Sequence, residues 1–356
     1  MKRLFLPLLL CLPSWGAGWT CYYPLTYDHT QTGSSNSSSF PALVSFNAAA
    51  MKSGSGDVQS SAGADILFFS DSGLTTQIPS QIVYYDNVNG IGWFRVLIST
   101  LSSSTNGTIY MAVGNASPSS RTTGVWDAHT VAMWPFDNGT TLDLTDVVAG
   151  MHTLTGYSSP QAAAGKVAGA YAAGPWWASA SDSGFLLGNV AQSLSAWIYM
   201  PSGASNLTIF TWGNTGSSEG VNVYVDTSPG EFAIVGGPTA IYPHPGFSTG
   251  SWYHIAFTFD GTNLSEYVNG VLTYGPSAFS FNTVAGGGLG TAYQNGTTNA
   301  GSISALRVSS VARGSDWIKA EYNNENAPGD IGSPGFWTFG ARTLLGIARR
   351  RTIVVQ

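Results

Sequence analysis

Aromatic side chains in or beside expected loops are the first residues of this chain that could do chemistry, by stacking on the face of a sugar ring. An indole or phenol offers apolar area next to one polar group, which suits saccharide recognition. The stretch GPWWASA sets two tryptophans beside a glycine–proline pair, in a connection that could expose one ring. The candidate ligand-binding residues are Trp176, Trp177, Trp212 and Tyr242. The alternative is that at least one tryptophan fills a core.

An acidic loop, DNGTTLDLTD, is the second candidate, because carboxylates are the ligands that a hard cation such as Ca²⁺ prefers. Its acids are Asp137, Asp143 and Asp146. Asn and Asp also cap the turns of solvated loops. A metal site and plain turn chemistry therefore both remain open.

Catalytic motifs are not supported by the residues. Retaining glycosidases need two carboxyl groups roughly 5 Å apart, which on a strand means acids at alternate positions, and no strand-like run after Val125 carries such a pair. GSSEG places Ser218 in a G-x-S-x-G pattern, but it lies between two strand-like runs rather than at a strand-to-helix elbow. The histidines lack zinc-site spacing, and His254 is expected at the surface. We predict no catalytic residue and no enzyme.

The N-terminus has the order of a secretory signal: Lys2 and Arg3, an apolar run to Leu12, then small residues. We expect residues 1–18 to be removed and the protein to be secreted, extracellular or at the cell surface. No segment approaches the ~20 apolar residues of a transmembrane helix. With 19 acidic and 13 basic residues, nucleic acid is not an expected partner. Removal of the signal leaves Cys21 without a disulfide partner.

Composition and periodicity predict an all-β protein. The chain holds 44 glycines, 12 tryptophans and 16 tyrosines, and short apolar runs alternate with turn residues, as in FPALVSF and GWFRVLIS. In WYHIAFTFDG, apolar and other residues alternate with the period of a half-buried strand. Asn269-Gly270 predicts a tight hairpin. We expect two antiparallel β-sandwich domains.

One short helix is expected near the C-terminus, within SDWIKAEYNN. Ser315 is the predicted N-cap, and Pro328 prevents continuation. The apolar face should pack on the sandwich through Trp317, Ile318 and Tyr322. The polar residues are expected to form its solvated face: Arg313, Asp316, Lys319 and Glu321.

The second half resembles a known family through SLSAWIYM, WYHIAFTFDGTNLSEYVNGVL and RVSSVARGSDWIKAEYNN. These motifs are similar to the laminin-G-like (LamG), concanavalin A-type jelly roll of bacterial secreted proteins. The first half, with YDHTQT, GADILFFSDSG and GVWDAH, resembles the uncharacterised domain that commonly precedes such modules. The resemblance implies a jelly roll that often binds carbohydrate or protein, with calcium at its rim in some members, and it does not imply catalysis.

The chain departs from this family at two places that bear on calcium. Many relatives have an Asp-Glu pair where this chain has Ser304-Ala305, and Phe-Asp-Gly where it has Ala172-Ala173-Gly174. Both changes remove carboxylates that Ca²⁺ would need. We therefore expect no cofactor, and calcium is disfavoured.

These observations predict four segments: a signal peptide at 1–18, an N-terminal β-sandwich of the uncharacterised family at 19–124, a LamG jelly roll at 125–340 and a basic tail at 341–356. The expected function is an exported, non-catalytic binding or adhesion protein whose partner is a polysaccharide or surface glycan. The alternative is a self-assembling structural subunit of an extracellular appendage, surface layer or virion, whose partners are copies of itself.

Overall fold

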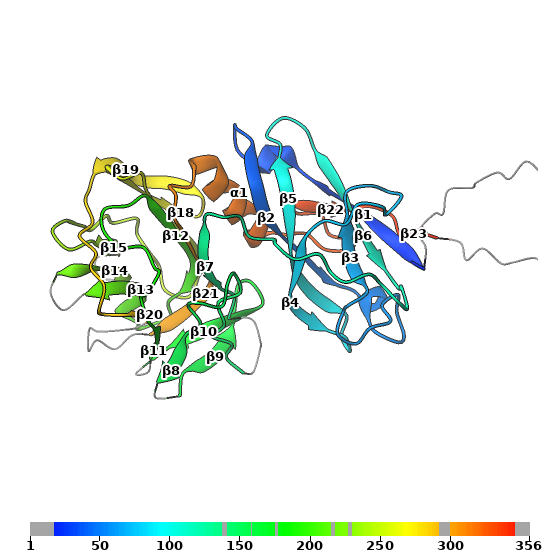
Figure 1. Cartoon of the computed structure of the whole chain (residues 1–356), viewed down its shortest axis with the longest axis horizontal. Coiled ribbons are helices and arrows are strands. Elements are labelled where there is room, and N and C mark those ends of the chain that lie inside the picture. Colours follow the sequence, from blue (N-terminus) through cyan, green and yellow to red (C-terminus); the bar gives the residue numbers. More distant parts are fainter. Residues whose placement is uncertain are drawn as a thin grey trace, which may run out of the picture.

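The computed structural model describes residues 18–136, 141–157, 159–174, 177–214, 218–226, 230–291 and 300–345. It is almost entirely β, with antiparallel sheets and one α-helix near the C-terminus among these residues. The predicted fold class is confirmed. The sheets lie in two parts, joined where α1 and β2 meet (Figure 1). No helix in the described ranges is both long and apolar enough to cross a membrane.

The N-terminal sandwich consists of two facing sheets. One has the strand order β22-β1-β6-β3, with β23 also paired to β1, and the other has the order β2-β5-β4. Alternate residues of β1 point into the core between them, which is the period-two pattern of a strand with one inner face. The elements of the N-terminal sandwich are β1 (Cys21–Tyr27), η1 (His29–Gln31), β2 (Ser37–Asn47), η2 (Ala49–Met51), β3 (Ile66–Phe69), β4 (Ser80–Asp86), β5 (Ile91–Leu101), β6 (Gly107–Val113), β22 (Trp337–Phe339) and β23 (Thr343–Leu344).

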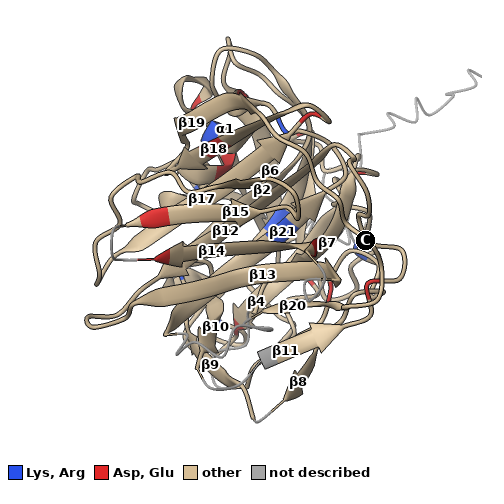
Figure 2. Ribbon diagram, turned by 90° about the vertical axis from the view of Figure 1, so that its left-hand side faces the viewer, with Lys and Arg blue, Asp and Glu red and all other residues tan. Residues whose placement is uncertain are grey.

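The C-terminal sandwich packs a sheet of order β19-β18-β17-β12-β21-β10-β9, with β7 beside β21, against a sheet of order β16-β15-β14-β13-β20-β11-β8. Figure 2 shows the second of these sheets across the front of the molecule. The strands of the whole C-terminal sandwich are β7 (Thr130–Trp134), β8 (Thr155–Tyr157), β9 (Gln161–Ala164), β10 (Gly169–Ala173), β11 (Trp177–Ala180), β12 (Gln192–Tyr199), β13 (Asn206–Asn214), β14 (Glu219–Asp226), β15 (Glu231–Val235), β16 (Ala240–Ile241), β17 (Trp252–Phe259), β18 (Asn263–Val268), β19 (Val271–Ala278), β20 (Leu289–Thr291) and β21 (Gly301–Ser309).

The hairpin predicted at Asn269-Gly270 is present between β18 and β19, where Val268 pairs with Val271. Asn269 has φ 50° and Gly270 has φ 73°, the positive values that a two-residue hairpin turn requires. A Cβ on Gly270 would lie 3.1 Å from the Cβ of Tyr322. The glycine therefore serves both the turn and the close approach of α1.

The helix α1 (Ser315–Asn326) lies between the two sandwiches rather than on the surface of one (Figure 1). Trp317 meets the Phe40 ring of the N-terminal sandwich edge-to-face at 5.0 Å. On the other side, Tyr322 lies 5.7 Å from the Trp197 ring of β12. Because both sides of the helix are covered, Glu321, Asn324 and Glu325 are buried together with its apolar residues, whereas Lys319 is exposed as predicted.

This position changes the roles predicted for the polar residues around α1. Gly314 is the N-cap, and Ser315 is the first helical residue. Arg313 and Glu321 are buried, 8% and 2% exposed, so the prediction of a solvated face is wrong for them. Arg313 donates two hydrogen bonds of 2.7 Å to Asp127, and burial without that partner would be costly.

The end of the chain returns to its beginning. Leu25 of β1 pairs with Phe339 of β22, and Cys21 pairs with Leu344 of β23. The expected LamG segment ran to residue 340, and residues beyond it were expected to form a tail. The strand pairing instead places 337–339 and 343–344 in the N-terminal sheet, and such short strands carry no periodic signal in the sequence. The rest of the predicted basic tail, from residue 346, lies outside the described residues.

Candidate functional site

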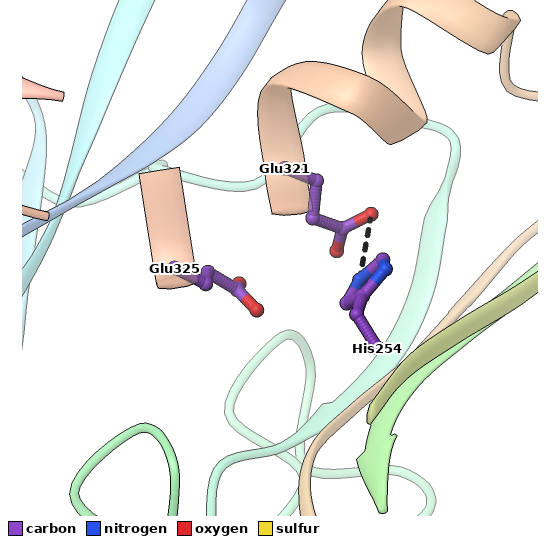
Figure 3. A group of neighbouring side chains, drawn as sticks. All are labelled: His254, Glu321 and Glu325. Carbon is purple, nitrogen blue, oxygen red and sulfur yellow. Dashed lines mark ion pairs between the residues drawn. The ribbon is translucent and has the colours of Figure 1, made fainter. Parts of the chain in front are cut away.

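Three titratable side chains gather between α1 and β17 (Figure 3). Glu321 and Glu325 are one helical turn apart, so both point the same way, and His254 comes from the face of β17 that α1 covers. One ligand atom from each lies within 4.8 Å of the others, and all three residues are buried. Because histidine and carboxylate oxygen both ligate transition metals, the group is a candidate metal centre.

Two arginines compensate the charge of this group. Arg95, from β5 of the N-terminal sandwich, lies 2.6 Å from a Glu325 oxygen. Arg307, from β21, lies 3.1 Å from Glu321 and 3.7 Å from Glu325. When the imidazole is neutral, the two arginines balance the charges of the two glutamates. A metal ion would add charge beside two guanidinium groups, so these residues fit a buried ion-pair network and do not fit a metal centre.

Hydrogen bonds hold the two carboxylates in place. Ser195 Oγ donates to Glu321 Oε1 at 2.9 Å, and the Trp197 indole N–H donates to Glu325 Oε2 at 2.7 Å. Burial opposes ionisation of Glu325, but the two arginines outweigh it and hold the pKa of this carboxyl below its usual value. Glu325 therefore stays ionised at neutral pH and is no proton donor.

His254 is 1% exposed, so the prediction that it lies at the surface is wrong. Both faces of its strand are covered, since α1 and the N-terminal sandwich lie against the outer one. Burial lowers the pKa of His254, although Glu321 and Glu325 favour the charged form. Neither ring nitrogen has a hydrogen-bond partner in the described part of the chain. The imidazole is neutral at pH 7.

Among the predicted sugar-stacking residues, Trp212 and Tyr242 are the two whose side chains the structure describes. Trp212 is 1% exposed and donates its indole N–H to the Leu186 carbonyl at 3.0 Å, so this ring cannot contact a ligand. Tyr242 is 47% exposed. Trp176 lies outside the described residues, and Trp177 begins β11 with a side chain that is likewise outside them.

The two described acids of the acidic loop, Asp143 and Asp146, do not form a calcium site. Asp146 is buried, and its carboxylate accepts backbone N–H groups of Met133, Val148 and His152 at 3.0–3.3 Å. Asp143 accepts the N–H of Thr145, as in an ordinary turn. Asp137 lies outside the described range. The turn-capping alternative accounts for Asp143, whereas Asp146 is a buried acceptor that ties the loop to β7.

Two further motifs have structural roles. Ser304, at one of the positions where family carboxylates are replaced, is fully buried, with Oγ 2.8 Å from the Gly169 carbonyl. Ser218 lies in the turn between β13 and β14, whose ends pair at Asn214 and Glu219, so the predicted hairpin loop is confirmed. Cys21 is buried in the N-terminal core, and a disulfide to a neighbouring copy would require β1 to move.

A cleft of about 550 Å³ lies where the two sandwiches meet. Residues of β4 form one wall, the connection between the sandwiches forms another, and the segment after β7 contributes two valines. Clefts between domains are frequent ligand sites. The lining residues are Ser80, Gln81, Ile82, Arg121, Thr123, Gly124, Val125, Trp126, Val147 and Val148.

Hydrogen bonds fix the polar side chains of this cleft. Arg121 donates to Ser80 Oγ at 2.9 Å and to the Gly63 carbonyl at 3.0 Å, and its guanidinium lies 5.5 Å from the Phe94 ring centroid. The Trp126 indole N–H donates to Gln81 Oε1 at 3.0 Å. No local motif predicted these residues as a site, because the two walls of the cleft are far apart in the chain. The available signal was an arginine five positions before a tryptophan, in a connection with few charged residues.

Comparison with known families finds a match within the C-terminal sandwich. Residues 176–319 match the family model Laminin_G_3, described as the concanavalin A-like lectin/glucanases superfamily. These residues therefore carry a concanavalin A-like domain, as the LamG resemblance predicted. No curated protein matches the chain in sequence. The resemblance of the first half to an uncharacterised family stays a prediction.

Similar solved structures include carbohydrate-bound and receptor-binding domains. Domain 4 of AbnA, a GH43 extracellular arabinanase from Geobacillus stearothermophilus solved with arabinotriose, has a TM-score of 0.45 and 20% identity, over 55% of this chain and 98% of that one. The botulinum neurotoxin serotype D binding domain has a TM-score of 0.42 and 12% identity, over 55% and 51%. The binding domain of Paraclostridial Mosquitocidal Protein 1 has a TM-score of 0.44 and 12% identity, over 56% and 53%. The match thus spans about half of each toxin domain.

Proposed function

We propose that this protein is an exported, non-catalytic binding or adhesion protein that recognises carbohydrate or a surface glycoconjugate. The observation that carries the proposal is the concanavalin A-like lectin/glucanase domain at residues 176–319. Export is proposed from the N-terminal 18 residues, which have the charge and apolar pattern of a secretory signal.

The state of the buried carboxylates supports binding over hydrolysis. A glycosidase needs an accessible acid and a second carboxylate across the scissile bond. The two glutamates that lie close together in the described structure, Glu321 and Glu325, are each 2% exposed and paired with arginines. A substrate could not reach them, and an ionised Glu325 could not protonate a leaving group.

A glycan array probed with the full-length mature chain tests this function. We expect binding to at least one polysaccharide or glycoconjugate, unchanged by EDTA because the described acids form no calcium site. We also expect no release of reducing sugar from any bound polysaccharide. Absence of binding with and without calcium would overturn the proposal, and sugar release would overturn its non-catalytic part.

A further inference from the structure

The cleft between the sandwiches has the composition of a ligand site rather than of a packing defect. Apolar side chains line much of it, including Ile82, Val147 and Val148. Polar side chains lie among these apolar residues at defined positions. Gln81 belongs to β4, and the Trp126 indole is hydrogen-bonded to Gln81. Ligand pockets typically combine mostly apolar walls with a few placed polar groups.

Arg121 is the one charged residue among the described residues that line the cleft. Within the described part of the chain, no acidic side chain lines the cleft and Arg121 forms no ion pair. Burial lowers the pKa of Arg121 to about 10, so the guanidinium is still protonated at pH 7. In a chain of net charge −6, the cleft is therefore a local site of positive charge.

The hydrogen-bonding capacity of the cleft is biased toward donors. A guanidinium has five N–H groups, and the protein acceptors of Arg121 in the described structure are Ser80 Oγ and the Gly63 carbonyl. Gln81 Oε1 accepts a hydrogen bond from the Trp126 indole. The other end of the Gln81 amide, its NH₂ group, can therefore donate to a ligand. A ligand that fits must supply acceptors.

From these observations we propose that the cleft binds the acidic sugar residue of a carboxylate-bearing saccharide, an inference that rests on the proposed carbohydrate-binding function. Arg121 pairs with the carboxylate, since a guanidinium matches carboxylate geometry. The Gln81 amide donates to ring or hydroxyl oxygens. Trp126 and the valines contact the apolar face of the sugar.

The test compares acidic and neutral forms of the same saccharide by titration calorimetry with the full-length mature chain. The probes are oligogalacturonate with its methyl ester, and sialyllactose with lactose, so that two sources of sugar carboxylate are distinguished. We expect at least one acidic form to bind ten-fold or more tightly than its neutral counterpart. Equal affinity within both pairs would overturn the inference.

Gln81→Glu is the variant that isolates the cleft. It is nearly isosteric, keeps an acceptor for the Trp126 indole and places a negative charge in the lining of the cleft that also contains Arg121. We expect a loss of ten-fold or more in affinity for the acidic form, and a smaller loss for its neutral counterpart, which loses the amide donor but is not repelled by the new charge. Arg121→Ala is a poorer probe, because Arg121 also ties the connection to Ser80 and Gly63.

Gln161→Glu is the matched control, because it adds the same charge on exposed β9, outside the cleft lining, and is expected to bind like the wild type. Thermal unfolding confirms that all variants are folded. If Gln81→Glu binds acidic saccharide as well as the wild type, the cleft assignment is wrong while the proposed function stands. If no saccharide of any kind binds, both are wrong.

Discussion

Single residues show how strongly burial controls titration in this protein, and Glu266 is the clearest case. It lies on β18 between Leu264 and Val268, on the side that faces the C-terminal core. Its side chain is fully buried, and neither carboxyl oxygen has a hydrogen-bond partner in the described structure. Burial raises the pKa of Glu266 to about 9, so this residue is protonated at neutral pH.

Stability should therefore fall with rising pH because of Glu266. The folded pKa is about 9 and the ordinary value is 4.5, so the folded state keeps a proton that the unfolded state loses between these two values. We expect Glu266→Gln to raise the free energy of unfolding at pH 7 by about 2 to 3 kcal/mol.

Urea denaturation of Glu266→Gln and the wild type from pH 4 to pH 9 measures this effect. The two proteins should be nearly equal at pH 4, where both side chains are neutral, and should diverge as pH rises. A difference that does not change with pH would show that Glu266 titrates normally in the folded protein.

Among the elements, α1 decides how the two sandwiches join. Asn324 is fully buried and pairs with the backbone of β2, accepting the Leu43 N–H at 2.6 Å and donating to the Leu43 carbonyl at 2.8 Å. The Trp337 indole N–H also donates to this carbonyl. These bonds satisfy backbone groups on the side of β2 that does not pair with β5, where an unpaired strand edge would otherwise be left.

Asn324→Ala should lower the free energy of unfolding by about 2 to 4 kcal/mol, because it leaves a buried N–H of β2 without a partner. Asn326→Ala, at the exposed end of the same helix, should change it by less than about 0.5 kcal/mol. Chemical denaturation of both variants provides the measurement. Equal effects at the two positions would mean that the amide pairing with Leu43 contributes little.

At the scale of the whole molecule, the two sandwiches share buried contacts on both sides of α1. Ala256 and Tyr267 of the C-terminal sheet belong to the same apolar cluster as Phe40 of the N-terminal one. The Arg95–Glu325 pair crosses the same boundary. The return of β22 to β1 closes the chain on itself. We therefore expect wild-type unfolding to be a single cooperative transition.

Arg95→Met should destabilise the protein by about 3 to 5 kcal/mol, because it leaves part of the Glu325 charge buried without a partner. It should also separate the unfolding of the two sandwiches, seen as non-coincident transitions by fluorescence and circular dichroism. Arg342→Met removes an ion pair with Asp57 whose arginine is 40% exposed, and its expected cost is below about 1 kcal/mol. A small effect of Arg95→Met with coincident transitions would contradict the coupling.

The sequence by itself determined the local features of this protein. Alternating apolar residues, the Asn269-Gly270 turn and the helix between Ser315 and Pro328 all depend on neighbours in the chain, and such short-range patterns are readable without coordinates. The concanavalin A-like domain was also predictable, because its motifs lie in order along one segment. The reading of Ser218 as a hairpin residue followed from the same local reasoning.

Only the tertiary structure decided which of these residues are buried and which meet. Period-two alternation identifies two faces of β17, but it cannot tell that the outer face is covered by α1 and the N-terminal sandwich, which brings His254 and Glu321 together. The cleft likewise forms from Gln81, Arg121 and Val148, residues that no local pattern connects. Burial is a property of non-local packing, so the charge and exposure of these side chains depend on partners that lie far away in the chain.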